Sequence, residues 1–502
     1  MSETGNPANG TETCDECPLT CLIVGAGNRG NKYSSYAKLF PSQMKVVAVA
    51  EPNQIRLENL CKKVGTVQKE CMFSDWREAA EKEKFADFVI ITTTDRQHRD
   101  PAVAFAQKGY DILLEKPMAV TLEDCKEIVA VCKKCNVTLA VCHVLRYTPW
   151  VTMIKDFIDS GRIGDVVNIR LTEPVGFWHF AHSYVRGNWR NTTSSTSSLM
   201  AKSCHDLDLI NYWMSPKRCI SVGSFGNLTH FTKENKVGFW HFAHSFVRGN
   251  WHKEDSSTFS LMSKSCHDID LIAYWMSPKV CVSVSSFGNL SHFTKSNKPA
   301  QATSRCLDCP VEQDCPYSAK KIYIDAYKSG NTGWPVKTIT DIMDLENITE
   351  ALRTGPYGKC VYDTDNDVVS HQVVNFQFED GATANFSMVA FTKRICAREV
   401  KVYGTKGEIV YEDGWDRMQI CDFRTENTEY WPVQREFPSE MAGHGGADFN
   451  LMKTFIESLK SKTKQMATGP EDTLRSHLLV FAAEKARLEK KVVTIEADGS
   501  FH

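Results

Sequence analysis

The stretch Leu19–Gly30, which reads LTCLIVGAGNRG, decides the fold of this chain. An apolar, β-rich run that ends in Gly-x-Gly-x-x-Gly and continues into residues 31–40 predicts a strand, a tight turn and a helix. This geometry points backbone N–H groups at a pyrophosphate, with Gly25 forming the turn, Gly27 admitting the phosphates and Gly30 allowing close helix packing. The motif alone is weak evidence, because an ordinary turn between a strand and a helix can also contain three glycines.

A second apolar run, Met44–Ala50, ends at Glu51. An acid roughly 20 residues beyond the glycines binds the ribose hydroxyls of NAD and repels the 2′-phosphate of NADP. The sequence therefore predicts NAD as the cofactor, with NADP less favoured. Arg56 lies nearby and softens that preference, and a solvated acid at a strand end is the alternative interpretation of Glu51.

Length and composition exclude several classes of protein. A chain of 502 residues with 42% hydrophobic content is long enough for two or more packed domains. Its 59 basic and 61 acidic residues argue against nucleic-acid or membrane-surface binding. Residues 1–17 are polar, which predicts a disordered tail and no signal peptide. Nineteen cysteines without a secretory signal indicate a reducing compartment, so we expect a cytoplasmic protein.

Short Val- and Ile-rich runs alternate with amphipathic segments up to about Thr148. This alternation predicts an α/β fold in which residues 18–150 form a Rossmann domain, a doubly wound parallel sheet covered on both faces. Thr121, with Asp124 three residues later, is the predicted N-cap of a helix. Ligands bind beyond the carboxyl ends of such strands. Besides the three glycines and Glu51, the expected cofactor-binding residues are Asn28, Arg29, Thr92, Thr93, His98, Glu115, Lys116, Pro117 and Arg146.

Four further motifs are more specific than the glycine turn: Thr92-Thr93-Thr94 with His98, Glu115-Lys116-Pro117, Arg146-Tyr147-x-Pro149, and Gly161-Arg162-Ile163-Gly164. Together they resemble the glucose–fructose oxidoreductase, inositol dehydrogenase and rhizopine-catabolism family over Leu19–Arg487. The resemblance implies that Lys116 lies beside the nicotinamide and the substrate hydroxyl. Independently, a lysine between a carboxylate and a proline at a strand end is a positioned cation. A surface lysine is the alternative.

Residues 151–502 are predicted to form a second, α+β domain. Val373–Phe378 and Ala382–Met388, joined by Asp380-Gly381, indicate a β-hairpin. The resemblance implies that such strands build a large, open and mostly antiparallel sheet behind the cofactor domain. It also implies that the exposed face of this sheet pairs chains in a homo-oligomer.

The most unusual feature is an internal repeat. Residues 175–236 recur as residues 237–298 at a constant offset of 62, with 48 identical positions. Two copies fall short of a stacked array, and the implied domain has room for one. One copy should therefore dock in the sheet, while the other is extruded, loosely folded or used for pairing between chains. Copy one has a polar Ser/Thr run at 191–198 where copy two has Phe259, which slightly favours copy two as the docked one.

Each copy carries a candidate acid–base catalyst, His205 or His267. Imidazole titrates near neutral pH, and oxidation of an alcohol needs a proton acceptor within hydrogen-bond reach. The resemblance aligns a His-x-x-Asp segment with His205 and Asp208, or with His267 and Asp270. The aspartate that many members carry four residues before this histidine is missing here. Two lysines one residue further on are therefore expected to share its role: Lys202 and Lys264. A core histidine is the alternative.

Two other groups are expected near the substrate. His182 belongs to an aromatic, polar set that suits a sugar ring or serves packing, together with Trp178, His179, Trp240, His241 and His244. His444-Gly445-Gly446 with Asp448 is similar to a stretch in relatives and is expected to close the site from the carboxyl-terminal side.

Cys306-x-x-Cys309 followed by Cys315 has the ligand spacing of a structural zinc knuckle. Cys360 is the expected fourth ligand. Four thiolates would close the tetrahedron and leave no open position for catalysis. Buried thiols without a metal are the alternative.

The sequence as a whole predicts an NAD-dependent oxidoreductase that removes a hydride from a secondary hydroxyl of a sugar or polyol, or performs the reverse reaction. Two alternatives stay open. The resemblance permits a glycoside-cleaving enzyme that cycles its NAD between redox states. The duplication leaves room for a non-catalytic, NAD-binding assembly protein.

Overall fold

The computed structural model describes residues 17–174, 182–183, 191–192, 204–213, 218–222, 253–254, 259, 262, 266–290, 292–392, 395, 397–461 and 466–502. Several predictions lie outside these residues: the tail before Cys17, Lys202, Lys264, the side chain of His267, and Trp178, His179, Trp240, His241 and His244. Of the helices that are described, none combines the length and the apolar character needed to cross a membrane.

The amino-terminal sheet has six parallel strands in the order β3-β2-β1-β4-β5-β6. The strands are β1 (Leu19–Val24), β2 (Met44–Ala50), β3 (Met72–Phe73), β4 (Phe88–Ile91), β5 (Asp111–Leu114) and β6 (Leu139–Val141). The central strand β4 is buried throughout, which explains why such strands are uniformly apolar and do not alternate. The predicted Rossmann sheet is confirmed, and its strand order reverses beside β1, where a dinucleotide binds in this fold.

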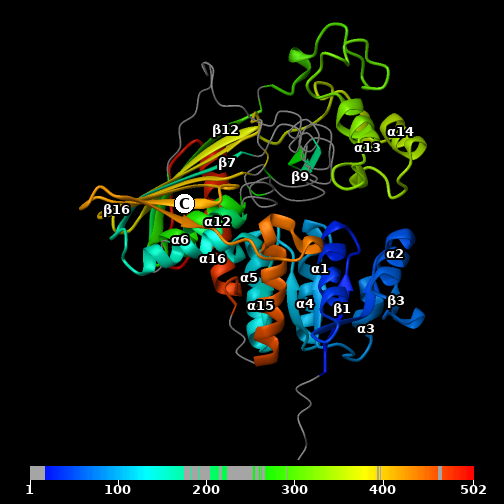
Figure 1. The fold of residues 1–502 in the computed structure, drawn as a ribbon, viewed down its shortest axis with the longest axis horizontal. Helices are drawn as coiled ribbons and strands as arrows, with labels where there is room; N and C mark the ends of the chain where they lie inside the picture. Colours follow the sequence, from blue (N-terminus) through cyan, green and yellow to red (C-terminus); the bar gives the residue numbers. More distant parts are fainter. Residues whose placement is uncertain are drawn as a thin grey trace, which may run out of the picture.

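Helices flank this sheet (Figure 1). They are α1 (Asn28–Leu39), α2 (Gln54–Val64), α3 (Trp76–Glu81), α4 (Arg99–Gln107) and α5 (Leu122–Lys134). Thr121 caps α5, because its side chain accepts a hydrogen bond from the backbone N–H of Asp124 at 3.1 Å. The N-cap predicted from the sequence is therefore confirmed.

In the described part of the chain, the second sheet has ten strands in the order β10-β19-β12-β13-β14-β7-β15-β16-β17-β18 and is mostly antiparallel, as predicted. Its strands are β7 (Val166–Pro174), β10 (Arg218–Val222), β12 (Val280–Asn289), β13 (His371–Phe378), β14 (Thr383–Val389), β15 (Glu399–Gly404), β16 (Gly407–Glu412), β17 (Arg417–Asp422), β18 (Thr428–Pro432) and β19 (Val493–Thr494). The expected β13–β14 hairpin turns at Gly381, whose φ of 84° favours glycine.

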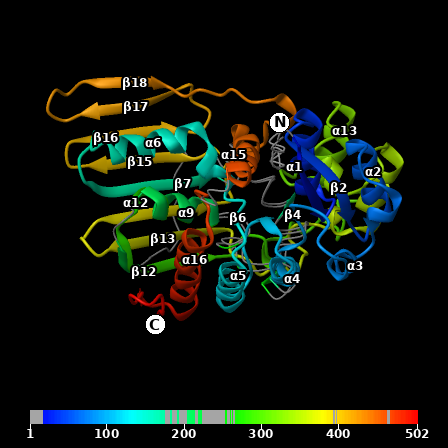
Figure 2. The same cartoon turned by 90° about the horizontal axis from the view of Figure 1, so that it is seen from below.

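Helices from distant parts of the chain cover one face of this sheet, among them α6, α12 and α16 (Figure 2). The remaining α-helices within the described residues are α6 (Pro149–Asp159), α9 (Cys204–Trp213), α12 (Cys266–Met276), α13 (Ala326–Lys328), α14 (Leu345–Thr354), α15 (Ala447–Ser461) and α16 (Pro470–Glu489). Helix α15 follows the second sheet in sequence but packs on the Rossmann domain, where Phe455 lies 5.4 Å from Phe88 between ring centroids. The carboxyl-terminal segment thereby reaches the cofactor side of the molecule.

A third, small core lies apart from the two sheets, between β12 and β13 in sequence (Figure 1). Its buried residues are Cys306, Ala319, Ile322, Tyr323, Val336, Ile348, Leu352 and Tyr357. The segment contacts the Rossmann domain through Asp341, whose carboxylate lies 3.1 Å from the Arg56 guanidinium on α2.

The two repeat copies have the same neighbours. Strands β10 and β12 both pair with Phe378 and Gln377 of β13, and both pair with β19. Trp213 and Trp275, which are equivalent residues, lie 6.2 and 6.0 Å from Trp150 at the same interplanar angle of 59°. Helices α9 and α12 therefore map to one place in the fold.

Candidate functional site

The glycine turn leaves space at the start of α1. Gly25 has a φ of 98°, and a Cβ atom there would lie 2.6 Å from the carbonyl oxygen of Thr92, so only glycine fits. A Cβ on Gly30 would collide with the carbonyl of Gly25. At Gly27 a Cβ would meet nothing within 4 Å, and no side chain caps the helix. The turn thus fits a pyrophosphate against the backbone N–H groups that begin at Asn28.

The Thr92–His98 loop supports this turn. The Thr92 hydroxyl donates to the carbonyl of Gly25 at 2.7 Å, and the Thr93 hydroxyl donates to Gln97 at 3.1 Å. His98 is fully buried, and its Nδ1 lies 2.6 Å from the carbonyl of Pro117. Burial lowers the pKa of His98, so a neutral ring with one N–H donates to Pro117. His98 therefore connects the loop after β4 to the residue that follows Lys116.

Glu51 lies at the end of β2, almost buried, beside the glycine turn. Its Oε2 accepts from the backbone N–H of Ala26 at 2.7 Å, and its Oε1 accepts from Asn53 at 3.0 Å. The carboxylate is thus held where the first strand meets the second. Arg56, which weakened the NAD prediction, is paired with Asp341.

Lys116 follows β5, and the side chain of Glu115 accepts from its backbone N–H at 3.0 Å. Glu115 and Asp448 also share the Arg29 guanidinium, at 2.6 and 2.8 Å. Tyr33 donates to Glu115 at 2.7 Å. Arg29, which was predicted to bind the cofactor, therefore ties α1 to the strand end before Lys116 and to α15.

This ion cluster is buried and stays ionised. Burial opposes the charge on Glu115, but Arg29 and Lys116 outweigh it, so the pKa of Glu115 lies below its usual range. Burial likewise opposes ionisation of Asp448, and Arg29 and His444 hold the pKa of Asp448 well below its ordinary value. His444 reaches this cluster with Nδ1 3.2 Å from Asp448.

Buried histidines gather behind Lys116. The ring of His143 lies 4.9 Å from that of His205 and 5.5 Å from that of His477, while His205 lies 6.5 Å from His444. His477 accepts from the backbone N–H of Met118 at 3.1 Å. The candidate acid–base His205 thus lies near His143 and His444, and His477 lies on the other side of His143.

The pKa of His205 lies well below 6.5, first because the ring is buried and then because His143, Arg398 and Lys116 are near. The pKa of His143 is lowered by the same burial, and His477, Arg146 and Lys116 add to it. Both imidazoles are therefore neutral at physiological pH. A neutral imidazole accepts a proton, which is what a general base must do.

Arg146 is buried and binds the repeat. Its guanidinium pairs with Asp270 at 3.1 Å and also with Asp208. Burial is the main cause that lowers the pKa of Arg146, to about 10. The aspartate of either His-x-x-Asp segment thus pairs its helix with Arg146 in the short helical turn Val144–Tyr147, which follows β6.

His143, Asp208 and Asp270 place ligand atoms within 4.8 Å of one another, a spacing that could hold a metal ion. Asp208 and Asp270 are the same position in two repeat copies that map to one place. A single docked copy leaves two of these ligands, and two do not complete a metal site.

Sequence reasoning missed His477 and Arg398. It did place His143, which follows the carboxyl end of β6, among the residues at the ligand-binding edge of the sheet. Arg398 pairs with Asp268 at 2.7 Å and with Glu173 at 3.2 Å. It and His477 come from distant segments, and nothing in their local sequence marks them.

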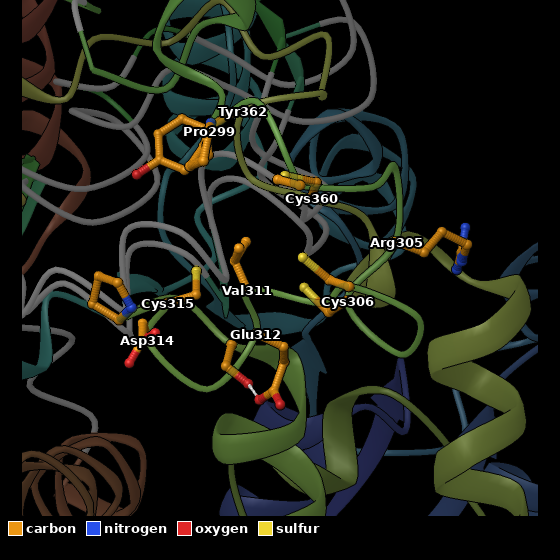
Figure 3. A pocket seen from close by; sticks show the side chains of 13 residues that line it. Pro299, Arg305, Cys306, Val311, Glu312, Asp314, Cys315, Cys360 and Tyr362 are labelled. Atoms are coloured by element: carbon orange, nitrogen blue, oxygen red, sulfur yellow. Dashed lines mark hydrogen bonds between the residues drawn. The ribbon is translucent and has the colours of Figure 1, made fainter.

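The four predicted cysteines line one cavity of about 270 Å³, shown in Figure 3. Cys306 and Cys360 are buried, and Cys309 and Cys315 are half-buried. The structure thus brings together the whole predicted set, including Cys360 from far along the chain.

The fold and the site describe a dinucleotide-binding α/β protein with a substrate domain behind it. Residues 19–143 match the oxidoreductase family with an NAD-binding Rossmann fold, and residues 217–495 match the carboxyl-terminal alpha/beta domain of that family. The chain belongs to this family, Gfo/Idh/MocA.

Three comparisons illustrate the relationship. An uncharacterized oxidoreductase of Streptococcus pneumoniae is 26% identical over 41% of this chain and 53% of its own length. Levoglucosan dehydrogenase of Pseudarthrobacter phenanthrenivorans is 26% identical over 39% of this chain and 50% of its own. A structure of levoglucosan dehydrogenase with NADH and levoglucosan shares the fold, with a TM-score of 0.60, 16% identity, and coverage of 95% of this chain and 99% of that one. The chain spans about half the length of the first curated relatives it matches.

Proposed function

We propose that this chain is an NAD-dependent oxidoreductase that transfers a hydride between the nicotinamide ring and a secondary hydroxyl of a sugar or polyol. The observation that supports the proposal is that Lys116 follows β5 and is close enough to the buried His205 and His143 for its charge to lower their pKa values. Relatives that include levoglucosan dehydrogenase and scyllo-inositol 2-dehydrogenase support the substrate class.

The roles follow from charge and position. Bound NAD supplies the hydride acceptor. Lys116 carries a positive charge that binds and polarises the substrate oxygen, and a neutral imidazole takes the hydroxyl proton. His205 is the described candidate, and His267 is its equivalent in copy two. Lys202 and Lys264 remain predicted contributors to the same relay.

NAD is favoured over NADP by two observations. Glu51 is a buried acid at the expected ribose position, and an acid there repels a 2′-phosphate. The nearby cation, Arg56, is paired with Asp341. A second carboxylate at this edge reduces the attraction for a phosphate further.

The experiment that tests the proposal mixes purified chain, NAD and a panel of sugars and polyols, and follows the absorbance of reduced nicotinamide. A dehydrogenase accumulates NADH with at least one substrate. Cleavage of a glycoside without net NADH would instead identify the redox-cycling alternative. NAD binding without turnover, and unchanged in Lys116→Ala, would identify the non-catalytic alternative.

We also propose that the two repeat copies are alternative occupants of one place. Arg146 pairs with Asp208 and Asp270, and the same edge of β13 pairs with β10 and β12. One strand edge binds one partner, so one copy docks at a time. Copy two is favoured, because β12 pairs with β13 from Cys281 to Asn289, while the described part of β10 pairs at Cys219 and Ser221.

A homo-oligomer is a further proposal. Tyr430 and Trp431 on β18, a strand at the end of the sheet, are 56% and 39% exposed. An exposed aromatic edge strand is a surface that proteins usually cover. Light scattering on the purified chain measures the oligomeric state, and a monomer would contradict the proposal. A cytoplasmic location stays a prediction.

A metal centre in the four-cysteine cavity is the last proposal. Thiolates that converge from a Cys-x-x-Cys pair, Cys315 and Cys360 are a metal-binding set. Structural zinc stays a prediction of the sequence, and elemental analysis of purified chain tests whether a metal is bound.

A further inference from the structure

The backbone holds the four cysteines around one cavity before any ligand arrives. Cys306 donates its N–H to Gly358 at 2.8 Å, and Cys360 donates to Ser304 at 2.8 Å. A β-bridge joins Arg305 to Lys359 between them. Cys360 is therefore fixed opposite the Cys-x-x-Cys pair, although it lies far away in sequence.

The loop itself is a series of tight turns. The N–H of Cys309 is bonded to Cys306, that of Glu312 to Cys309, and that of Cys315 to Glu312, at 3.1 to 3.4 Å. Each turn brings the next side chain back toward the same side. Figure 3 shows Cys306, Cys315 and Cys360 around the cavity. Such preorganisation lowers the cost of binding a group that needs all four thiolates.

The cavity is larger than one zinc ion needs. Tetrahedral zinc with Zn–S bonds of about 2.3 Å draws its sulfurs to about 3.8 Å from one another. Among the described residues, no three of the four sulfurs lie within 4.8 Å of one another. The cavity, which nine other residues also line, has a volume of about 270 Å³, which exceeds what a single ion fills.

The rest of the cavity wall also suits a larger, anionic cofactor held by thiolates. It is largely apolar, with Pro299, Val311 and Pro316 among its residues. Glu312 is not available as a competing ligand, because its carboxylate accepts from Ser318 and pairs with Lys320 at 3.8 Å. Apolar walls around four cysteines are typical of iron–sulfur sites, where burial tunes the cluster.

The small third core supplies an independent reason for a covalent link. Among the described residues it contains eight buried apolar side chains, Cys306 and Tyr357 among them, with six partly buried ones packed against it. A core of this size rarely supplies enough hydrophobic free energy, and small cores commonly rely on metals or disulfides. The cysteines are thiols, so a metal group is the available link.

We propose that Cys306, Cys309, Cys315 and Cys360 bind a four-iron, four-sulfide cluster that holds this segment together. The inference rests on the proposed metal centre and specifies its chemistry. The proposed role of the cluster is structural, and no electron-transfer step is proposed for it.

The test uses the full chain purified without oxygen. Iron, acid-labile sulfide and zinc are measured per chain, together with the visible absorbance of sulfide-to-iron charge transfer and its loss on reduction. We expect iron and sulfide in equal amounts, near four of each per chain. Stoichiometric zinc without sulfide would overturn the cluster and retain a metal centre. If the chain contained no iron and no zinc, both the cluster and the metal centre would be overturned.

Variants locate the site. Cys315→Ser and Cys360→Ser should lose the iron, the sulfide and the visible band. Cys421→Ser, a half-buried cysteine on β17 outside the cavity, should keep all three. Retention of the band in Cys360→Ser and Cys315→Ser would overturn the assignment. Calorimetry on the same preparations measures NAD binding by the Rossmann domain separately. Failure of the cluster proposal and failure of the oxidoreductase proposal can therefore be distinguished.

Discussion

At the scale of single residues, the chemistry of the proposed site depends mainly on Lys116. Its backbone is held by Glu115, and its charge helps to keep His143 and His205 neutral. A cation that polarises the substrate oxygen also keeps the nearby base in its proton-accepting form. The side chain therefore acts in two ways through one charge.

Replacing this charge should affect turnover more than cofactor binding. We expect Lys116→Ala to lower kcat by about 10²- to 10⁴-fold, the range for a positioned acid–base or polarising group, while the Kd for NAD changes little. Steady-state kinetics and calorimetry measure the two effects. Lys133→Ala, whose side chain is 77% exposed, is the matched control. Equal losses of binding and turnover would indicate a cofactor-binding role instead.

The neutral histidine predicts a pH profile. A base with a pKa well below 6.5 loses its accepting form only when the pH falls through that lowered pKa. The acid limb of kcat/KM should therefore lie below pH 6.5. A profile that already falls between pH 7.5 and 6.5 would show that an unperturbed imidazole, and not His205, controls the proton.

Asp341 offers a test of cofactor choice. Asp341→Asn frees Arg56 from its partner, so we expect NADP to bind about threefold better, the modest size that an exposed ion pair allows. NAD should be unaffected. Asp416→Asn, at a side chain that is 93% exposed, is the control. NADP kinetics identical to those of the parent chain would contradict a role for Arg56 at the 2′ position.

At the scale of elements, Arg29 joins three parts of the site: α1, the end of β5 and α15. Its partners Glu115 and Asp448 are 5% and 0% exposed. Their folded pKa values are depressed, so they stabilise the fold above their unfolded pKa values. This contribution is lost as the pH falls through the folded values.

Removing the Arg29 charge should destabilise the fold, because the buried carboxylates of Glu115 and Asp448 lose this partner. We expect Arg29→Met to destabilise the chain by about 3 to 5 kcal/mol. The defect should shrink as the pH is lowered from 7 toward 5, because protonation then neutralises the uncompensated acids. Thermal unfolding against pH measures this. Arg77→Met, on a surface pair with Asp75, should cost less than about 1 kcal/mol. A defect independent of pH would indicate lost packing instead of lost charge.

At the scale of the whole molecule, the repeat is the unusual element. Trp150 and Arg146 contact equivalent residues of the two copies. Chains that lack residues 175–236, or residues 237–298, should therefore fold cooperatively and bind NAD, while a chain that lacks both should not fold. Thermal unfolding and calorimetry test the three deletions. If neither single deletion folds, both copies are needed at once and the proposal is wrong.

The sequence by itself determined the Rossmann domain and most of its ligand-facing edge. Uniformly apolar strands, a Gly-x-Gly-x-x-Gly turn and the cap at Thr121 are local signals, each set by backbone geometry within a few residues. It also predicted the set Cys306, Cys309 and Cys315 from the spacing that metal ligands follow, and the fold brings the more distant Cys360 to the same cavity. The hairpin at Gly381 was predictable for the same local reason.

Tertiary structure alone decided which distant side chains meet. Arg29 reaches Asp448 across most of the chain, His477 binds beside Lys116, and Arg398 pairs with Asp268. No local pattern encodes these pairs, since their partners meet only after separate segments of the chain have packed together. The same holds for the repeat: the sequence contains two copies, and the structure shows that β10 and β12 pair with the same residues of β13.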